Sequence, residues 1–231
     1  MTLKQDYIIL ADLGEQTMKI DCLVLGLYET NCYILHSGAD DSVCTVIDPG
    51  QGGFELIDYL GKNDLTPVDV ILTHGHADHI AGVEQLREHF PRIKVYIHKL
   101  DGAMLTGEQD NLSELTGLVF KIQSADVLLS EGDSILMRLG LKDIKLEVIH
   151  TPGHTPGGMC LYAKEQNVLF SGDTLFAGSV GRTDFPGGNI MGLISGIKSK
   201  LLTLPDETRV YPGHGPITTI GSEKTGNPFI S

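Results

Sequence analysis

Four potential metal ligands fall within six residues of this sequence, directly after a short apolar run. The stretch reads Thr73-His74-Gly75-His76-Ala77-Asp78-His79. Imidazole and carboxylate groups are the ligands that zinc and related first-row metals accept. Packing alone gives no reason to crowd them together, because without a cation their desolvation and the repulsion among protonated rings are costly. The segment therefore predicts a metal site. The alternative is a polar loop that is rich in histidine by chance.

Three later segments also end β-rich runs in residues of ligand type. The run before His150 continues through a Pro-Gly turn to His154, and two further runs end in Asp173 and His214. Proline and glycine fix a tight backbone path in such loops. Loops at one edge of a sheet converge on a shared site, so the strand ends predict one common site.

The composition is typical of a folded globular protein. Of 231 residues, 41% are hydrophobic and 20% charged, which argues against disorder. The chain has 17 basic and 30 acidic residues, a net charge of −13 with neutral histidine, which disfavours RNA, DNA or anionic lipid as partners. A bound divalent cation reverses that sign locally, so a small anionic substrate stays compatible with the sequence.

The four cysteines favour a reduced protein. They show no Cys-x-x-Cys spacing and lie among aliphatic neighbours, so we interpret them as small buried hydrophobic residues: Cys22, Cys32, Cys44 and Cys160. The amino-terminal residues do not lead into a long apolar stretch, and no run reaches transmembrane length. We therefore expect a cytoplasmic protein with no membrane association.

Short β-rich runs and helical patterns alternate along the chain. Ile80, Val83, Leu86 and Phe90 recur near helical spacing and predict a helix over residues 78–90, and a second helix is predicted over 190–203. No Pro/Ser-rich linker separates these elements, so residues 1–231 are expected to form one α/β domain. Residues 99–133 have weaker periodicity and could cover a substrate pocket.

The four ligand-bearing segments, in this order, resemble the metallo-β-lactamase superfamily, with its His-x-His-x-Asp-His signature and later His, Asp and His ligands. The match extends from Asp48 to His214. The resemblance implies an αββα sandwich, two mixed sheets flanked by helices, with a metal pair at one edge. It implies a first ligand set of His74, His76 and His154 and a second set of Asp78, His79 and His214. Asp173 is then the carboxylate that bridges the two metals, and Asp48 lies on an acidic turn behind the site.

Hydrolysis follows from this implied ligand set. Seven protein ligands spread over two ions leave open positions, and a water shared by two cations readily becomes a hydroxide nucleophile. We expect Asp78 to orient that water as well as to bind metal. An incompletely coordinated ion can polarise a substrate carbonyl. The chain has no Gly-x-Ser-x-Gly elbow that would suggest a serine nucleophile. The expected cofactors are two divalent ions, zinc first, with iron or manganese as alternatives.

The tail Pro212-Gly213-His214-Gly215-Pro216 looks like that of the short glyoxalase II-like proteins, which are hydroxyacylglutathione hydrolases. This similarity implies cleavage of a small-molecule thioester such as S-lactoylglutathione. Asp173 occupies a position where some lactamase subclasses have cysteine, which favours the glyoxalase type. Lactone or phosphoester hydrolysis stays open as an alternative. The sequence leaves the oligomeric state open.

A second alternative comes from the segment Gly181-Arg182-Thr183-Asp184-Phe185, whose form is shared with the short glyoxalase II-like group and with persulfide dioxygenases. Such an enzyme would use one iron, held here by His79, His154 and Asp173. Arg182 either pairs with Asp184 to brace its glycine-rich loop or binds a substrate carboxylate, for which its planar fork is suited. Tyr28 and Asn31, near a turn, are further candidates to face the metals.

Overall fold

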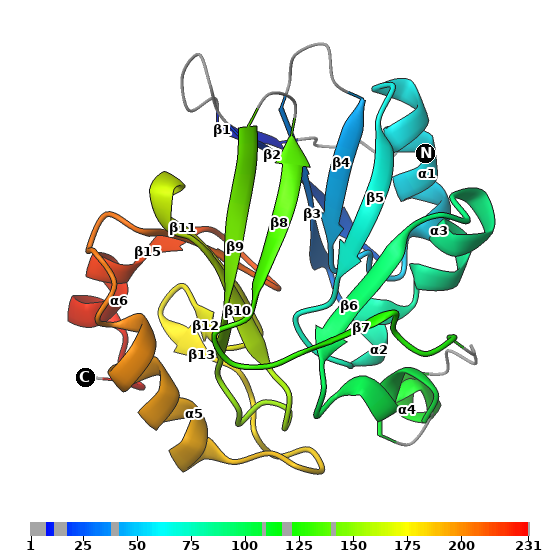
Figure 1. The fold of residues 1–231 in the computed structure, drawn as a ribbon. Helices are drawn as coiled ribbons and strands as arrows, with labels where there is room; N and C mark the ends of the chain where they lie inside the picture. Colours follow the sequence, from blue (N-terminus) through cyan, green and yellow to red (C-terminus); the bar gives the residue numbers. More distant parts are fainter. Residues whose placement is uncertain are drawn as a thin grey trace, which may run out of the picture.

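The computed structural model describes residues 8–11, 18–37, 42–107, 110–116, 122–139 and 142–230. Two β-sheets pack face to face, with helices on both outer surfaces (Figure 1). This is the αββα sandwich of two mixed sheets that the sequence predicted. All seven expected metal ligands lie within the described residues.

The amino-terminal sheet contains seven strands in sequential order. Neighbouring strands are antiparallel from β1 to β4 and parallel from β4 to β7. The strands are β1 (Ile8–Ala11), β2 (Lys19–Leu25), β3 (Thr30–His36), β4 (Val43–Ile47), β5 (Thr66–Ile71), β6 (Lys94–His98) and β7 (Val127–Leu129).

The carboxy-terminal sheet contains six strands in the order β15-β14-β11-β10-β9-β8, and β12 pairs with β13 in a separate hairpin. Only the β11–β14 pair in the six-stranded sheet is parallel. The strands are β8 (Ser134–Leu139), β9 (Lys142–His150), β10 (Met159–Ala163), β11 (Val168–Gly172), β12 (Leu175–Phe176), β13 (Ser179–Val180), β14 (Arg209–Pro212) and β15 (Thr218–Thr219).

Helices cover the outer faces of both sheets (Figure 1). Helices α1 (Gly53–Lys62) and α3 (Val83–His89) pack on the first sheet, and α5 (Ile190–Gly196) and α6 (Ile220–Gly226) pack on the second. The shorter helical elements are α2 (Ala77–Ile80), α4 (Ser113–Thr116), the 3₁₀ turns η1 (Gly102–Leu105) and η2 (Lys164–Gln166), and the π turn η3 (Ile197–Leu201).

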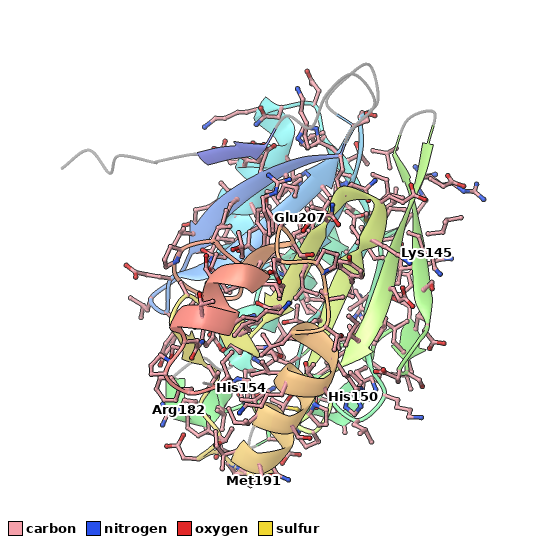
Figure 2. The ribbon with its side chains drawn as sticks, turned by 90° about the vertical axis from the view of Figure 1, so that its left-hand side faces the viewer. Lys145, His150, His154, Arg182, Met191 and Glu207 are labelled. Carbon is pink, nitrogen blue, oxygen red and sulfur yellow. The ribbon has the colours of Figure 1, made fainter. Side chains whose placement is uncertain are left out.

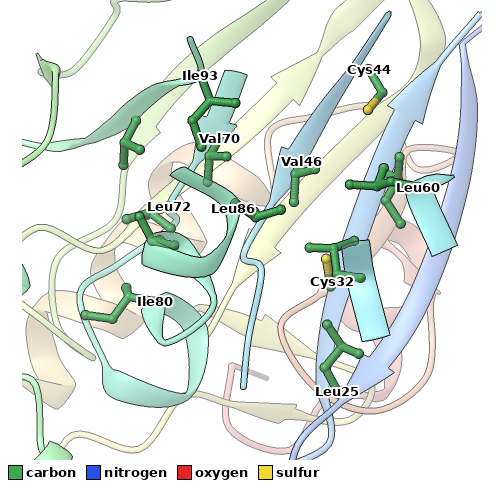
Figure 3. Close-up of a cluster of buried hydrophobic side chains, with 14 of the residues drawn as sticks. Leu25, Cys32, Cys44, Val46, Leu60, Val70, Leu72, Ile80, Leu86 and Ile93 are labelled. Atoms are coloured by element: carbon green, nitrogen blue, oxygen red, sulfur yellow. The ribbon is translucent and has the colours of Figure 1, made fainter. Parts of the chain in front are cut away.

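Three apolar layers hold this arrangement together. One lies between the sheets, and the other two lie beneath the helices of each outer face. Figure 3 shows the layer beneath α1 and α3, where Leu60 and Leu86 meet Val46 and Val70 of the sheet. Cys32 and Cys44 belong to this layer, and all four cysteines are free and buried, as the sequence indicated. Burial of apolar surface is the main stabilising contribution of such layers.

The predicted helix over residues 78–90 was wrong in being continuous. The structure has two helices there, α2 and α3, and Gly82 caps the start of the second. A Cβ atom at position 82 would lie 2.9 Å from the carbonyl oxygens of both Pro49 and Gly50. The chain therefore breaks its helix where it passes close to the turn that carries Asp48. The second predicted helix, over 190–203, corresponds to α5 continued by η3.

None of the helices in the described ranges combines the length and the apolar character needed to cross a bilayer.

Candidate metal centre

The strands that carry the expected ligands all end at the same edge of the sandwich. In the first sheet, β4 and β5 are parallel, so Asp48 and the loop from His74 to His79 follow at one edge. In the second sheet, β9, β11 and β14 run in the same direction and lead to His154, Asp173 and His214. Because the carboxyl ends of such strands share an edge, residues far apart in the sequence converge there.

The structure brings all seven sequence-predicted ligands together, in the two sets that the resemblance implied. The ligand atoms of His74, His76 and His154 lie within 4.8 Å of one another, and so do those of Asp78, His79 and His214. A third such group joins His74 and His79 to Asp173. Three donors at this spacing can converge on one ion. Their role as ligands stays a prediction.

Asp173 lies between the two sets. Its Oδ1 is 3.4 Å from His79 Nε2, and its Oδ2 is 3.4 Å from His154 Nε2 and 3.6 Å from His214 Nε2. One carboxylate therefore faces histidines of both sets, which is the position required of a bridging ligand. The alternative iron-binding trio of His79, His154 and Asp173 does not occur among the three groups that the described residues form.

Asp48 supports the site from behind, where the sequence placed it. Its Oδ1 accepts a hydrogen bond from the Thr73 amide (2.8 Å), and its Oδ2 accepts one from the Thr73 hydroxyl (2.7 Å) and contacts His79 Nδ1 at 2.9 Å. The carboxylate thus fixes Nδ1–H of His79 and leaves Nε2 directed at the cluster. Such carboxylate partners orient metal-binding imidazoles and raise their basicity.

The same network defines the tautomer of His74. Because the Thr73 hydroxyl donates to Asp48, its oxygen accepts from His74 Nδ1 at 3.1 Å. Nε2 of His74 is then the unprotonated nitrogen. In His154, Nδ1 donates to the carbonyl oxygen of Arg182 at 2.7 Å, which leaves Nε2 unprotonated as well. An imidazole binds a metal through such a free nitrogen.

Burial and neighbouring charges set opposite proton affinities within the cluster. Burial lowers the pKa of His74 well below its ordinary value and that of His76 to about 3, and nearby histidines add to both shifts. Burial also lowers the pKa of His79, but Asp78, Asp173 and Asp48 outweigh it and raise this pKa to about 10. The neutral rings suit metal binding, while the carboxylates around His79 attract a cation that competes with its proton.

Two buried polar atoms support the fit of a metal ion to these residues. Within the described part of the chain, His74 Nε2 and Asp173 Oδ1 are buried without a hydrogen-bond partner. Leaving a buried polar group unpaired costs about 1–3 kcal/mol. Both atoms belong to residues of the same group of potential ligands. A cation bound among them would supply the missing partner.

Glycines make room for the closest approaches. A Cβ at Gly181 would overlap the carbonyl oxygen of Asp173, and a Cβ at Gly213 would collide with the carboxylate of Asp173 and lie 2.8 Å from His79 Cε1. The absence of a side chain at both positions lets the β13 and β14 ends reach the cluster. Asn31 also holds the last loop, because its Nδ2 donates to the carbonyl oxygens of Pro212 and Gly215, both at 2.9 Å. Asn31 thus positions His214 instead of facing the metals.

A cavity of about 730 Å³ opens beside the cluster. Asp78, His76, His154, Asp173 and His214 form its polar side. Most of the remaining wall is apolar and is formed by Tyr28, Leu112, Phe176, Val180, Phe185 and Pro216. Leu112 belongs to the 99–133 segment that was expected to cover a pocket. A concave, mostly apolar site with a few convergent polar groups is typical of small-molecule binding.

Arg182 lies at the rim of this cavity, near His154 in Figure 2. Its Nε and Nη2 donate to the two oxygens of Asp184, both at 2.7 Å, and its guanidinium lies 4.0 Å from the centre of the Phe185 ring. The bracing interpretation of Arg182 is therefore the geometry that the structure adopts. The side chain is 58% exposed and remains within reach of a ligand in the cavity.

Comparison with known proteins gives family matches along most of the chain. The model of the metallo-beta-lactamase superfamily matches residues 25–214. The probable metallo-hydrolase YqgX of Bacillus subtilis is 39% identical over 215 residues, which are 93% of this chain and 98% of YqgX. The hydroxyacylglutathione hydrolase GloC of Haemophilus influenzae is 35% identical over 220 residues, 93% of this chain and 99% of GloC.

Solved structures extend the similarity. The BLEG-1 B3 metallo-beta-lactamase has a TM-score of 0.84 at 41% identity, covering 92% of this chain and 99% of its own. TTHA1623 in a di-iron-bound form has a TM-score of 0.77 at 39% identity, covering 90% of this chain and 98% of its own. ETHE1 from Myxococcus xanthus has a TM-score of 0.72 at 31% identity, covering 90% of this chain and 83% of its own. Of these neighbours, one is named as a B3 metallo-beta-lactamase and another is described in a di-iron-bound form.

Proposed function

The chain belongs to the metallo-β-lactamase superfamily, and we propose that this metallo-hydrolase cleaves the thioester bond of a small acyl-thiol such as S-lactoylglutathione. The observation that carries the proposal is that all seven expected metal ligands lie together beside a largely apolar cavity. The similarity to GloC over 93% of the chain supports the choice of a thioester.

Two divalent ions in this cluster would lower the pKa of a coordinated water and polarise the substrate carbonyl. The protein contributes position and charge. Burial raises the pKa of Asp78, but His79 and His214 outweigh it and lower this pKa below its ordinary value. Asp78 is therefore a carboxylate that accepts a hydrogen bond from the attacking water and orients it.

The cavity walls suit the two halves of a thioester. Phe176, Val180 and Phe185 provide apolar contacts for the acyl group or for the carbon chain of the thiol and exclude bulk water. Hydrolysis breaks the C–S bond, adds the oxygen of water to the acyl carbon, and transfers a proton from that water to the departing thiolate. A thiolate is a good leaving group, so the site needs no strong general acid beside the sulfur.

Metal analysis combined with substrate assays tests this proposal. We expect about two metals per chain, as elemental analysis measures them, and turnover of S-lactoylglutathione. Zinc is the first expectation, and reconstitution with iron or manganese tests the alternatives. A lactone, a phosphoester and a β-lactam serve as comparison substrates. Preferential turnover of any of these over the thioester would overturn the assignment.

A mononuclear-iron persulfide dioxygenase is the second candidate. It stays open because the Gly181-to-Phe185 segment, whose form both groups share, lies at the site, with Arg182 and Phe185 lining the cavity. Oxygen uptake with glutathione persulfide measures this activity. One iron per chain together with oxygen uptake would replace the hydrolase proposal, whereas two metals without oxygen uptake would eliminate the dioxygenase.

A further inference from the structure

A buried carboxylate that the sequence did not reveal joins the two loops of the first ligand set. Asp101 caps the η1 turn after β6, and its side chain is fully buried. We propose that Asp101 is a positioning residue that sets the spacing of the first metal position by tying the His74–His76 loop to the His154 loop. This inference rests on the metal-dependent function proposed above.

Both oxygens of Asp101 are used to hold these loops. Oδ2 accepts hydrogen bonds from the Gly75 amide (3.1 Å) and the Thr155 hydroxyl (2.7 Å), and Oδ1 accepts one from the Gly157 amide (2.5 Å). Gly75 separates His74 from His76, and Thr155 follows His154 directly. Hydrogen bonds to an ionised carboxylate are roughly twice as strong as neutral ones. One side chain thus fixes the backbone on both sides of the site.

Glycine at two positions lets the η1 turn approach both loops. A Cβ at Gly157 would lie 2.6 Å from Asp101 Oδ1, and a Cβ at Gly75 would lie 2.6 Å from the Cβ of Met104, which belongs to η1. No ordinary side chain fits at either position without displacing the turn. The two glycines and the buried carboxylate therefore form one fitted contact.

The loops that Asp101 joins meet at the metal-binding atoms themselves. His76 Nδ1 lies 2.9 Å from His154 Nε2, so the separation of the loops determines the separation of two ligands. Asp101 contributes no atom to the three ligand groups and does not line the cavity. Its effect on the metal therefore passes through Gly75, Thr155 and Gly157.

Asp126 provides a control carboxylate away from the ligand groups. Its Oδ2 accepts hydrogen bonds from the Val95 amide (2.8 Å) and from Arg87 Nη2 (3.1 Å), so it also ties separate segments together. It belongs to none of the ligand groups, and its side chain is 47% exposed. Replacing Asp126 tests what the loss of a structural carboxylate does by itself.

The experiment measures zinc binding to metal-stripped wild-type, D101N, D126N, T155V and T155S proteins by competition with a chromophoric chelator. In D101N, the new side-chain –NH₂ group replaces one of the two oxygens that accept hydrogen bonds in the wild type. It then faces another donor, so at least one loop loses its hydrogen bond to residue 101. We expect D101N to bind zinc at the first position roughly 10- to 100-fold less tightly than the wild type, the usual effect of losing a supporting carboxylate. D126N should bind zinc as the wild type does.

The Thr155 pair keeps the test decisive if D101N does not fold. T155V loses the hydroxyl that donates to Asp101, so it should bind zinc less tightly, as D101N does. T155S retains the hydroxyl and should bind zinc with wild-type affinity. Wild-type affinity in both D101N and T155V would overturn the inference, as would equal weakening in D101N and D126N. A wild-type protein that binds no zinc, iron or manganese would instead overturn the proposed function.

Discussion

The carboxylates around His79 determine how the site responds to cations. Asp48 contacts Nδ1 of this ring, while Asp78 and Asp173 lie near Nε2 at 3.5 and 3.4 Å. The cluster thus concentrates negative charge in a buried place beside neutral imidazoles. A divalent cation offsets that charge far better than a single proton does.

Replacing Asp173 by alanine tests the bridging position. Because Asp173 faces both ligand sets, D173A should lower the metal content below two per chain and reduce kcat/KM by on the order of 100-fold or more, as loss of a charge-stabilising group does. Elemental analysis and steady-state kinetics measure the two effects. D58A, which removes an exposed carboxylate on α1, is the control. Unchanged metal content in D173A would contradict the bridging role.

A second buried carboxylate predicts how stability depends on pH. Asp21 Oδ2 contacts His36 Nε2 (2.7 Å) and accepts a hydrogen bond from Tyr59 (2.9 Å). Burial raises the pKa of Asp21, but its hydrogen bonds with His36 and Tyr59 outweigh this and hold the pKa below its ordinary value. Ionised Asp21 therefore adds stability above its unfolded pKa, and this contribution is lost as the pH falls through the folded value.

D21N should accordingly cost about 1–3 kcal/mol at neutral pH, since a buried hydrogen-bonded group loses its matching partner. The wild type should lose that advantage as the pH falls through the lowered pKa of Asp21, so that the two unfolding free energies converge. Urea unfolding of the metal-free proteins at a series of pH values measures this difference. Parallel pH profiles would show that Asp21 does not titrate as its contacts indicate.

Short elements outside the two main sheets build the cavity wall. The β12–β13 hairpin contributes Phe176 and Val180 to the cavity. Helix α6 holds this hairpin, because Glu223 accepts a hydrogen bond from the Gly178 amide (2.9 Å) and Asn227 donates one to the carbonyl oxygen of Ser179 (3.0 Å). Glu223 is only 3% exposed, so these contacts are shielded from water.

The anchoring of the hairpin predicts a kinetic effect. Glu223 also accepts from Thr218 Oγ1 (2.6 Å) and Asn227 Nδ2 (2.7 Å), so E223Q would turn an amide –NH₂ toward at least one donor. We expect KM to rise with little change in kcat, because the wall shifts while the metal ligands stay in place, together with a loss of about 1–3 kcal/mol in stability. E207Q, at an exposed position, is the control. A fall in kcat at constant KM would contradict this assignment.

At the scale of the whole molecule, the site lies where the two sheets meet, beside the apolar layer between them and the hydrogen bonds from Asn31 to Pro212 and Gly215. His74, His76, Asp78 and His79 follow strand β5 of the first sheet, while the other expected ligands follow strands of the second. A cation bound by both groups would therefore connect the two halves of the sandwich. Because metal binds the folded chain and a preformed site is absent from the unfolded one, binding is linked to folding.

Removal of metal should lower the melting temperature. Ligand at 1,000 times its dissociation constant stabilises a fold by about 4 kcal/mol. For a chain of this length, 1 kcal/mol corresponds to a shift of about 2–4 °C, so the expected fall is about 8–16 °C. Differential scanning calorimetry before and after chelation measures it, and zinc should restore the original value. A melting temperature that is insensitive to chelation and to zinc would contradict coupling between the site and the fold.

The sequence by itself determined the chemistry of the site and the class of fold. Histidine and aspartate are costly to crowd together without a cation, so the stretch from His74 to His79 indicates a metal without any knowledge of tertiary contacts. Apolar runs with strand and helix periods, read together with the family resemblance, were enough to predict the αββα sandwich. The ligand cluster and the apolar periodicity lie within short stretches of the chain, so the residue types and their spacing reveal them.

Only the tertiary structure decided how the site is held and lined. Asp101 is a single aspartate in an irregular segment, 26 residues from Gly75 and 54 from Thr155, and no local pattern distinguishes it. Likewise, the break after Ile80 follows from the approach of Gly82 to Pro49 and Gly50, a contact between separate segments. Such roles depend on distances between parts of the chain that folding brings together, so the sequence contains no periodic or compositional trace of them.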